Sequence, residues 1–437
     1  MRRDETIFAL ASGHGRAGVA VVRVSGPAAR FAVQTVTRKP PPSPRRATLR
    51  ALRTGSGEIF DHALVLWFPG PDSFTGEDVG EFHIHGGRAV VNTLFAALSD
   101  IPGLRLARPG EFTRRAVENG KLDLTQAEAI ADLVDAETDA QRRQALRQYD
   151  GALAGLTDHW RGELSKALAW AEAAIDFSDE ELPDDVMADA RQNAATIKDA
   201  IAPHILDGRG ELVRDGLFVA VVGAPNAGKS SLVNALAGRD VAIVSETAGT
   251  TRDVIEVRLN LAGYAVVLAD TAGLRDAADK IEAEGVRRAL ARAEHADLVV
   301  WVRDGSVSDN ALEYQDKIDN NTVITVWNKA DLAWPEPQDG LKVSLRTGEG
   351  LETVVEAIAA AAREKLEGGE APLLTRARHR EALAEAVAAL GRAEIQEAPE
   401  LFAEDLRLAV RAIGRVAGRV DVEDLLDVIF RDFCIGK

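Results

Sequence analysis

The stretch Gly223-Ala-Pro-Asn-Ala-Gly-Lys-Ser230 determines the fold of the central part of the chain. An apolar run at 217–222 (LFVAVV) leads directly into it, and a helix-like stretch at 232–236 (LVNAL) follows. A glycine-rich loop between a strand and a helix lets successive backbone N–H groups surround a phosphate at the helix N-terminus. The lysine can then reach the β- and γ-phosphate oxygens, and the serine hydroxyl can bind Mg²⁺. The pattern predicts a nucleoside triphosphate site, with Lys229 on the phosphates and Ser230 on the metal.

Two motifs of a nucleotide-dependent switch follow this loop. A strand-like run ends at Asp270-Thr-Ala-Gly273, where the Asp270 carboxylate can hold Mg²⁺ through water and the Gly273 N–H can sense the γ-phosphate. Before it, Thr247-Ala-Gly-Thr-Thr-Arg-Asp253 contains Thr251, whose hydroxyl can reach the metal only while the γ-phosphate is present. We therefore expect a segment with two states.

The base is predicted to be guanine. The run at 323–327 (VITVW) leads into Asn328-Lys-Ala-Asp331. The Asp331 carboxylate can accept hydrogen bonds from the N1–H and the exocyclic amino group of guanine, which adenine does not offer. Ser344-Leu-Arg346 is expected to close over the base, although these residues also suit an ordinary turn. The predicted nucleotide is therefore GTP, not ATP.

The hydrolytic machinery departs from that of small GTPases. Those enzymes place a glutamine directly after the Asp-x-x-Gly motif to orient the attacking water, whereas here Leu274 occupies that position and can make no hydrogen bond. A cation near the phosphates could substitute, with the amide oxygen of Asn226 as a ligand. Glu282 is a second candidate, although its sequence context equally suits a solvated acid on a helix face.

Composition limits the class of protein. With 437 residues, of which 46% are hydrophobic, the chain can form several domains. The formal net charge of −17 argues against a general polyanion-coating protein but permits a local basic groove. No apolar run is long enough to span a membrane and no secretion signal opens the chain, so we expect a cytoplasmic protein. The single cysteine, Cys434, excludes an intramolecular disulfide and a thiolate metal cage. His83 and His85 alternate as on a strand and suit structural or surface positions better than a metal site.

Periodicity divides the chain into four segments and predicts a multidomain α/β and α fold. The first segment mixes strand-like and helical runs, as an α+β domain does. The second and fourth are helical, and Thr125 and Glu128 have the spacing of a capping box near the start of the second. The third alternates strands and helices, so we infer a P-loop nucleotide domain inserted into one discontinuous helical domain. The segments are 1–118, 119–212, 213–368 and 369–437.

Seven segments outside the nucleotide motifs form a further pattern: Gly15-Arg-Ala-Gly-Val19, Val22-Arg-Val-Ser-Gly26, Phe68-Pro-Gly-Pro-Asp-Ser-Phe-Thr-Gly-Glu-Asp78, Ala107-Arg-Pro-Gly-Glu-Phe112, Lys121-Leu-Asp-Leu-Thr-Gln-Ala-Glu-Ala-Ile130, Ala173-Ala-Ile-Asp-Phe177 and Phe433-Cys-Ile-Gly-Lys437. Together with the nucleotide motifs, they resemble the MnmE (TrmE) family of tRNA modification GTPases, and the resemblance runs through nearly all of the chain. The resemblance implies an N-terminal tetrahydrofolate-binding domain that also dimerises, a helical domain, and an inserted Ras-like, potassium-activated GTPase domain.

The resemblance also assigns roles to residues of the nucleotide domain. It implies that K⁺ takes the place of an arginine finger and that Glu282 orients the water. The implied K⁺ ligands are Asn226, Ser245, Thr247 and Thr250, and the Mg²⁺ ligands are Ser230 and Thr251. The expected GTP-binding residues are Asn226, Ala227, Gly228, Lys229, Ser230, Ser231, Ser245, Glu246, Thr247, Ala248, Gly249, Thr250, Thr251, Asp270, Thr271, Ala272, Gly273, Asn328, Lys329, Asp331, Ser344, Leu345 and Arg346.

For the chemistry, the resemblance implies a heterotetramer with an FAD-dependent partner of the MnmG type. Together they would place an aminomethyl or carboxymethylaminomethyl group on carbon five of the wobble uridine of certain tRNAs. The one-carbon donor would be a tetrahydrofolate derivative, 5-formyl- or methylene-tetrahydrofolate. The implied folate-binding residues are Arg23, Glu81, Lys121 and Lys437, although the spacing of the first three equally suits ordinary surface charges.

Cys434 allows two interpretations. Its aromatic and aliphatic neighbours suit a buried small hydrophobe, whereas its place three residues before the final Lys437 suits a thiolate that acts in the tRNA step as a catalytic residue. Farther upstream, Arg407, Arg411 and Arg415 form a stripe that suits either a solvated helix face or a phosphate track.

Two other functions remain in competition. A GTP-operated ribosome or RNA assembly switch without RNA chemistry would carry the same nucleotide motifs, but it would need neither Cys434 nor Lys121. A folate-binding structural protein with a vestigial nucleotide domain is disfavoured, because Lys229, Asp270 and Asp331 are intact.

Overall fold

The chain divides into two compact units in the computed structural model. The first comprises Met1–Ala131, Tyr149–Glu172 and Ala403–Lys437, and the second comprises Asp132–Gln148 and Ala173–Phe402. The structure describes residues 5–13, 15–176, 186–239, 241–243, 256–270, 295–307, 322–332, 334, 339–368, 371–420, 426, 429–430, 433–434 and 436.

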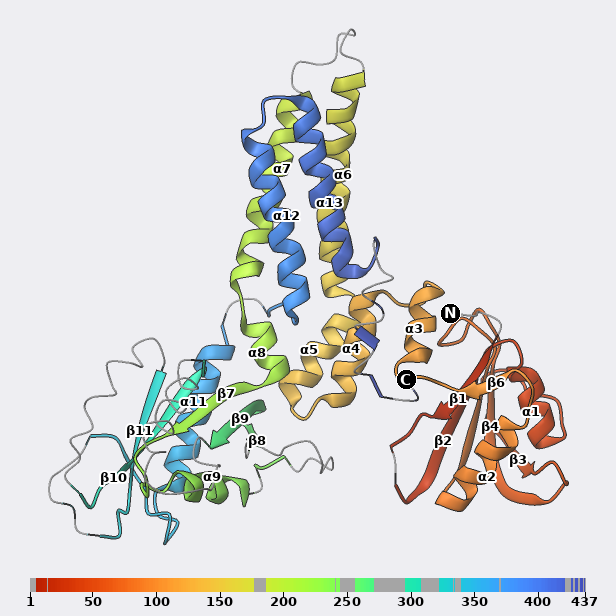
Figure 1. The fold of residues 1–437 in the computed structure, drawn as a ribbon, viewed down its shortest axis with the longest axis horizontal. Helices are drawn as coiled ribbons and strands as arrows, with labels where there is room; N and C mark the ends of the chain where they lie inside the picture. Colours follow the sequence, from red (N-terminus) through yellow and green to blue (C-terminus); the bar gives the residue numbers. More distant parts are fainter. Residues whose placement is uncertain are drawn as a thin grey trace, which may run out of the picture. The chain divides into compact units, whose positions relative to one another are not determined.

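A six-stranded sheet forms the centre of the first unit, in the order β3-β4-β5-β2-β1-β6 (Figure 1). Alternate residues of the strands, such as Val22, Val65 and Phe82, are buried against helices α1 and α2 on one face. The strands are β1 (Thr6–Leu10), β2 (Ala17–Ser25), β3 (Thr48–Arg53), β4 (Ile59–Phe68), β5 (Val79–Gly86) and β6 (Leu104–Leu106), and the helices are α1 (Ala29–Thr37) and α2 (Arg88–Ser99).

The second face of this sheet has two parts. At the β1 end, Ile7, Ala9 and Phe112 form a small core beneath helix α3 (Glu111–Glu118). At the β3–β4 end, Leu49 and Leu64 form a cross-strand pair whose side chains stay 64% and 43% exposed. This face therefore carries apolar surface that the first unit does not cover by itself.

Helix α4 (Leu124–Asp135) follows α3, and its N-terminal cap differs from the expectation. The Asp123 carboxylate accepts a hydrogen bond from the Gln126 N–H at 2.9 Å, and the Gln126 side chain accepts one from the Asp123 N–H at 3.1 Å. The predicted Thr125–Glu128 capping box is thus wrong: the reciprocal cap begins two residues earlier, and Thr125 lies buried inside the helix.

Helices α6 (Ala152–Asp176) and α13 (Pro399–Ala417) follow farther along the chain. In the first unit an ion pair of 2.8 Å joins Arg407 of α13 to Glu172 of α6. Beyond α13, Phe430 and Phe433 pack with Leu124 of α4 in one core cluster. The C-terminal segment is thereby fixed to the first unit.

A second six-stranded sheet, of order β12-β11-β10-β7-β9-β8, dominates the second unit. Its neighbouring strands are parallel except β8 and β9, which form an antiparallel hairpin. Helices α9 and α11 pack in its main core. The strands are β7 (Leu217–Val222), β8 (Glu256–Leu261), β9 (Tyr264–Asp270), β10 (Leu298–Asp304), β11 (Thr322–Asn328) and β12 (Leu341–Lys342), and the helices are α9 (Lys229–Ala237) and α11 (Leu351–Leu366).

The remaining helices of the second unit precede and follow the second sheet in the sequence. Helices α7 and α12 pack against each other, and Lys198 of α7 pairs with Glu394 of α12 at 2.5 Å. The bounds are α5 (Asp139–Tyr149), α7 (Val186–Leu206), α8 (Arg209–Asp215) and α12 (Ala377–Ile395). Because α4 to α8 precede the second sheet and α12 and α13 follow it, the expected fold is confirmed: a helical part interrupted by a Ras-like P-loop domain. No described helix is both long and apolar enough to cross a membrane.

Candidate functional site

The phosphate loop connects β7 to α9 at the C-terminal ends of the parallel strands of the second sheet. Strand β7 ends at Val222, and α9 begins at Lys229, directly after Gly228 in a left-handed conformation. The Lys229 ammonium donates hydrogen bonds of 2.9 Å to the carbonyl oxygens of Gly223 and Ala224. The cation is therefore held over the loop, next to the N–H groups of the helix start where an anion would bind.

Two glycines of the loop leave no room for a side chain. A Cβ on Gly223 would lie 2.0 Å from the Val302 carbonyl oxygen, and one on Gly228 would lie 2.2 Å from the Asn328 amide nitrogen. Both also have positive φ angles, of 151° and 108°. Asn226 has a φ of 62° and an exposed side chain; asparagine is one of the few residues that tolerates this conformation.

The predicted base-recognising residues lie together beside the loop. The Asn328 side-chain amide donates a hydrogen bond of 2.8 Å to the Ala227 carbonyl oxygen and accepts one of 3.2 Å from the Leu345 N–H. The Ser344 hydroxyl donates to the Asp331 carboxylate at 2.6 Å, and Arg346 pairs with the same carboxylate at 2.9 Å. Residues 344–346 thus form a turn that also meets the Asp331 carboxylate.

Electrostatics keep Asp331 ionised. Its hydrogen bond from the Ser344 hydroxyl, aided by Arg346, lowers the pKa of the Asp331 carboxyl below its ordinary value of 3.8. A carboxylate at this position can accept two hydrogen bonds from a guanine edge.

Asp304 is a residue of this edge that the sequence reading did not identify. It ends β10, accepts hydrogen bonds from the Ser306 hydroxyl at 2.6 Å and the Ser306 N–H at 3.0 Å, and pairs with the Lys329 ammonium. The signal in the sequence is a carboxylate at the end of a buried strand, because the C-terminal ends of parallel strands meet at one edge of a sheet. Val222, Asp304 and Asn328 end neighbouring parallel strands in this way.

Several predicted residues lie outside the described part of the chain. Asp270 ends β9, but its side chain is not described. The other residues in question are Ser245, Glu246, Thr247, Ala248, Gly249, Thr250, Thr251, Thr271, Ala272, Gly273, Leu274, Glu282 and Lys437.

A cavity of about 500 Å³ opens on the second face of the first sheet. It brings together three residues that are far apart in the sequence and were predicted to share a site: Arg23, Glu81 and Lys121. The full lining is Arg23, Arg45, Phe68, Asp72, Ser73, Phe74, Val79, Glu81 and Lys121.

Strand register determines the position of Arg23. It lies directly opposite Glu81 in the antiparallel β2–β5 pair, and the two side chains form an ion pair of 2.9 Å that is largely buried. The guanidinium also lies over the rings of Phe74 and Phe112, at 5.2 and 5.7 Å from their centroids. Because the cation is held from three sides, its remaining donors have a defined direction.

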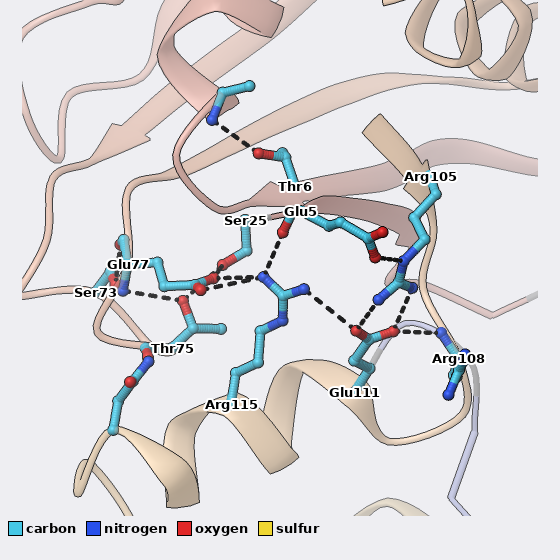
Figure 2. A network of polar contacts seen from close by, with 12 residues as sticks. Glu5, Thr6, Ser25, Ser73, Thr75, Glu77, Arg105, Arg108, Glu111 and Arg115 are labelled. Carbon is cyan, nitrogen blue, oxygen red and sulfur yellow. Dashed lines mark hydrogen bonds and ion pairs between the residues drawn. The ribbon is translucent and has the colours of Figure 1, made fainter. Parts of the chain in front are cut away.

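A buried ionic network holds the loop that forms one wall of the cavity (Figure 2). Arg115 of α3 donates to both carboxylate oxygens of Glu77 at 3.1 Å, and the Ser25 hydroxyl of β2 donates to the same carboxylate at 2.6 Å. Glu77 follows Ser73 and Phe74, which line the cavity. The network therefore fixes this wall against both a helix and a strand.

Arg105 and Arg115 converge on Glu111 in the same network (Figure 2). The Glu111 side chain is fully buried. Burial raises the pKa of the Glu111 carboxyl, but hydrogen bonds from Arg105 and the Arg108 N–H and the charges of both arginines outweigh it, so the pKa lies below 4.5. The carboxylate thus stays charged in the fold.

The backbone at Cys434 contacts the start of α3 in the first unit. The Cys434 carbonyl accepts a hydrogen bond of 3.2 Å from the Gly110 N–H, Phe433 beside it is buried, and the Cys434 side chain is exposed. The interpretation of Cys434 as a buried hydrophobe is therefore wrong, because its aromatic neighbours occupy the core position instead.

Two minor candidates have local partners. His85 pairs with Asp61 at 2.7 Å and His83 with Glu81 at 3.4 Å, and the described residues contain no cluster of three His, Cys, Asp or Glu that could hold a metal ion. Arg407 is paired with both Glu404 and Glu172, which supports the helix-face interpretation of the arginine stripe at that position.

Known proteins match this chain along almost its entire length. The family described as "GTP-binding protein TrmE N-terminus" matches residues 6–121, and the one described as "MnmE helical domain" matches residues 124–434. Proteins named "tRNA modification GTPase MnmE" are among the curated relatives. Those from Parvibaculum lavamentivorans, Paramagnetospirillum magneticum and Rhodospirillum rubrum are 56%, 54% and 56% identical, over 99% of this chain and 100%, 100% and 99% of theirs.

Proposed function

Because the chain belongs to the MnmE family of tRNA modification GTPases, we propose that it hydrolyses GTP and that this hydrolysis serves a modification of tRNA. One observation carries the first half of the proposal. The phosphate loop, Asn328, Asp331 and residues 344–346 are joined by hydrogen bonds into one edge of the sheet, although up to 101 positions separate the bonded residues. A site so assembled suits guanine with its phosphates.

In this site Lys229 would bind the β- and γ-phosphates, and Ser230 and Thr251 would ligate Mg²⁺. Ser230 is exposed in the first turn of α9, which suits a metal ligand beside a bound nucleotide. Asn226, Ser245, Thr247 and Thr250 would hold K⁺, which supplies positive charge where small GTPases use an arginine. Glu282 would orient the water, since Leu274 cannot.

The cavity of the first unit is proposed to bind a tetrahydrofolate derivative. Its volume of about 500 Å³ lies within the usual range for small-molecule sites. Lys121 suits the carboxylates of such a ligand, Arg23 and its ion-pair partner Glu81 together suit the polar edge of a pterin ring, and Phe68 and Phe74 offer apolar surface. Lys437 would complete the set. When bound, the folate would supply a one-carbon unit.

The tRNA step would take place with a partner protein. We propose an FAD-dependent partner of the MnmG type, a heterotetrameric complex, and an aminomethyl or carboxymethylaminomethyl group on carbon five of the wobble uridine. Cys434 would act in this step; its exposed side chain and the anchored backbone around it support that role.

The first unit is further proposed to dimerise. The exposed pair of Leu49 and Leu64, on the sheet face that also bears the cavity, supplies apolar surface for a second copy. The proposed domains are 1–118 for folate binding and dimerisation, 119–212 and 369–437 for the helical domain, and 213–368 for the GTPase domain.

Nucleoside analysis of tRNA from cells that lack this protein tests the proposal. We expect unmodified carbon five at the wobble uridine, restored by the wild-type gene and not by a Lys229→Ala variant. An unchanged nucleoside profile would favour the alternative, a GTP-operated assembly switch without RNA chemistry.

A further inference from the structure

Positive charge concentrates in one part of this acidic chain. Between Glu5 and Glu58 the sequence has nine lysines and arginines and no acidic residue, although the formal net charge of the chain is −17. Six of the nine lie within 38–53. The acidic surface elsewhere would repel a polyanion, so a polyanion would approach this region first.

The structure places these cations in and next to strand β3, which is an edge strand of the first sheet. We name five of them the β3 strip: Arg38, Lys39, Arg46, Arg50 and Arg53. Arg46 lies just before the strand, Arg50 lies within it and Arg53 ends it. Arg38 and Lys39 follow α1, and Arg38 donates to the Gly55 carbonyl at 3.2 Å, in the turn beyond the strand.

No described acidic side chain neutralises the strip. Arg38 and Arg53 donate to the carbonyl oxygens of Gly55 and Gly57, which orient the guanidinium groups but carry no net charge. The buried Nε of Arg50 has no hydrogen-bond partner among the described residues. Elsewhere in the chain, by contrast, exposed cations such as Arg142 and Lys166 are paired with acids.

Protection of a sheet edge explains only part of this pattern. Cations on an edge strand prevent it from pairing with another chain, and Arg50 and Arg53 could serve that purpose. Arg38, Lys39 and Arg46 lie outside the strand, where they block no backbone group. A six-residue strand spans about 20 Å, which matches the axial length of about six nucleotide steps of one duplex strand.

We infer that the β3 strip binds the phosphate backbone of tRNA, independently of sequence. The inference rests on the proposed function, because it takes tRNA as the substrate, and it adds the surface that receives it. Contacts of this kind position a nucleic acid without specifying bases. They allow a molecule of net negative charge to hold tRNA for the modification step.

A double charge reversal tests the strip. Lys39→Glu with Arg46→Glu removes no side-chain hydrogen bond that the structure shows and lowers the formal net charge by four. The matched control, Arg142→Gln with Arg143→Gln, Lys166→Gln and Lys198→Gln, lowers it by the same four at residues that pair with acids. Binding of a tRNA transcript with a wobble uridine is measured by fluorescence anisotropy over a range of salt concentrations.

We expect the reversal to weaken tRNA binding by at least about tenfold near 0.1 M salt and to flatten the slope of log K against log salt by about 0.7 to 0.9 for each lost phosphate contact. The control should keep both the affinity and the slope, and GTP hydrolysis should be unchanged in both proteins. An equal affinity and slope for the reversal and the wild type would overturn the inference while leaving the proposed function intact.

Three further outcomes separate the alternatives. Wild-type protein that binds no tRNA would contradict the proposed function and the strip together. Vesicles of anionic phosphatidylglycerol form the second arm: a reversal that loses vesicle binding but keeps tRNA binding would assign the strip to a lipid surface and refute the inference. If the reversal loses tRNA binding while the variants Arg38→Lys, Arg46→Lys and Arg53→Lys keep it, the inference is supported, because a contact with a phosphate backbone needs only the positive charge.

Discussion

The hydroxyl of Ser344 donates a hydrogen bond of 2.6 Å to the carboxylate of Asp331. Ser344 follows β12 and Asp331 follows β11, the parallel strand beside it. This bond lowers the pKa of Asp331 and orients one carboxylate oxygen, while Arg346 holds the other at 2.9 Å. The carboxylate proposed to recognise guanine is therefore ionised and positioned before any nucleotide binds.

Asp331→Asn should change the nucleotide preference from guanine to xanthine. An amide can donate to the second carbonyl oxygen of xanthine but can no longer accept both guanine donors, so GTP binding should weaken by about 100-fold. Nucleotide affinities measured by fluorescence titration test this, with Asp215→Asn as a surface control that keeps GTP affinity. Because the pKa of Asp331 lies below 3.8, the wild-type preference for GTP should persist down to about pH 4. A variant that still prefers GTP would contradict the assignment.

Turnover of GTP should be at least tenfold faster in K⁺ than in Na⁺ at equal ionic strength. The proposed reason is that K⁺ supplies the positive charge that stabilises the transferring phosphoryl group. Asn226→Asp keeps an oxygen ligand and should retain much of the advantage, whereas Asn226→Ala should lose it without a comparable loss of nucleotide affinity. Equal rates in the two salts for the wild type would rule out the potassium site.

Arg23→Met should abolish most binding of 5-formyl-tetrahydrofolate and leave GTP hydrolysis intact. Methionine preserves much of the side-chain volume but removes the charge and leaves Glu81 without its 2.9 Å partner. Arg30→Met is the matched control, because Arg30 also lies over an aromatic ring, that of Trp67, but does not line the cavity. Isothermal titration should show a loss of at least tenfold for Arg23→Met and unchanged binding for the control.

Gly110→Ala should impair tRNA modification although it does not substitute Cys434 itself. A Cβ at this position would lie 2.8 Å from the Phe430 ring and 2.9 Å from Phe433, and φ is already +64°. The C-terminal segment that carries Cys434 should therefore be displaced. We expect modification to fall as it does in Cys434→Ser, with GTP hydrolysis retained in both. Gly120→Ala, also at a positive φ but with open space around it, controls for backbone strain.

Stability should depend on pH through Glu111. Its folded pKa lies below the ordinary value, so its contribution is complete above about pH 4.5 and is lost as the pH falls through the folded pKa. Glu111→Gln should reduce the free energy of unfolding at pH 7 by about 3 kcal/mol, because Arg105 and Arg115 lose a buried partner. The difference from the wild type should shrink toward pH 3. Urea denaturation measures both, and Asp139→Asn, which breaks exposed ion pairs, should have little effect.

The motifs of the candidate nucleotide site could be recognised in the sequence because each motif by itself is local. A phosphate loop needs a strand, contiguous glycines and a helix start, and residues 217–237 contain all three in order. Asn328 and Asp331 directly follow another buried strand, and parallel strands in one sheet bring their C-terminal ends to a common edge. The ligands for Mg²⁺ and K⁺ at 245–251, together with Glu282, stay predictions, because they lie outside the described residues.

Tertiary structure alone decided the remaining features. Arg23 and Glu81 form a pair because of strand register, and no local pattern states which residues of two distant strands lie opposite each other. The reciprocal cap of α4 begins two residues earlier than predicted, at Asp123, and Thr125 is buried inside the helix. Cys434 is exposed because its neighbours Phe430 and Phe433 occupy the buried positions. The sequence was equally compatible with a buried cysteine. Local motifs thus specified which nucleotide this chain should bind, whereas long-range packing specified the cavity, its buried ionic wall and the position of the C-terminal cysteine.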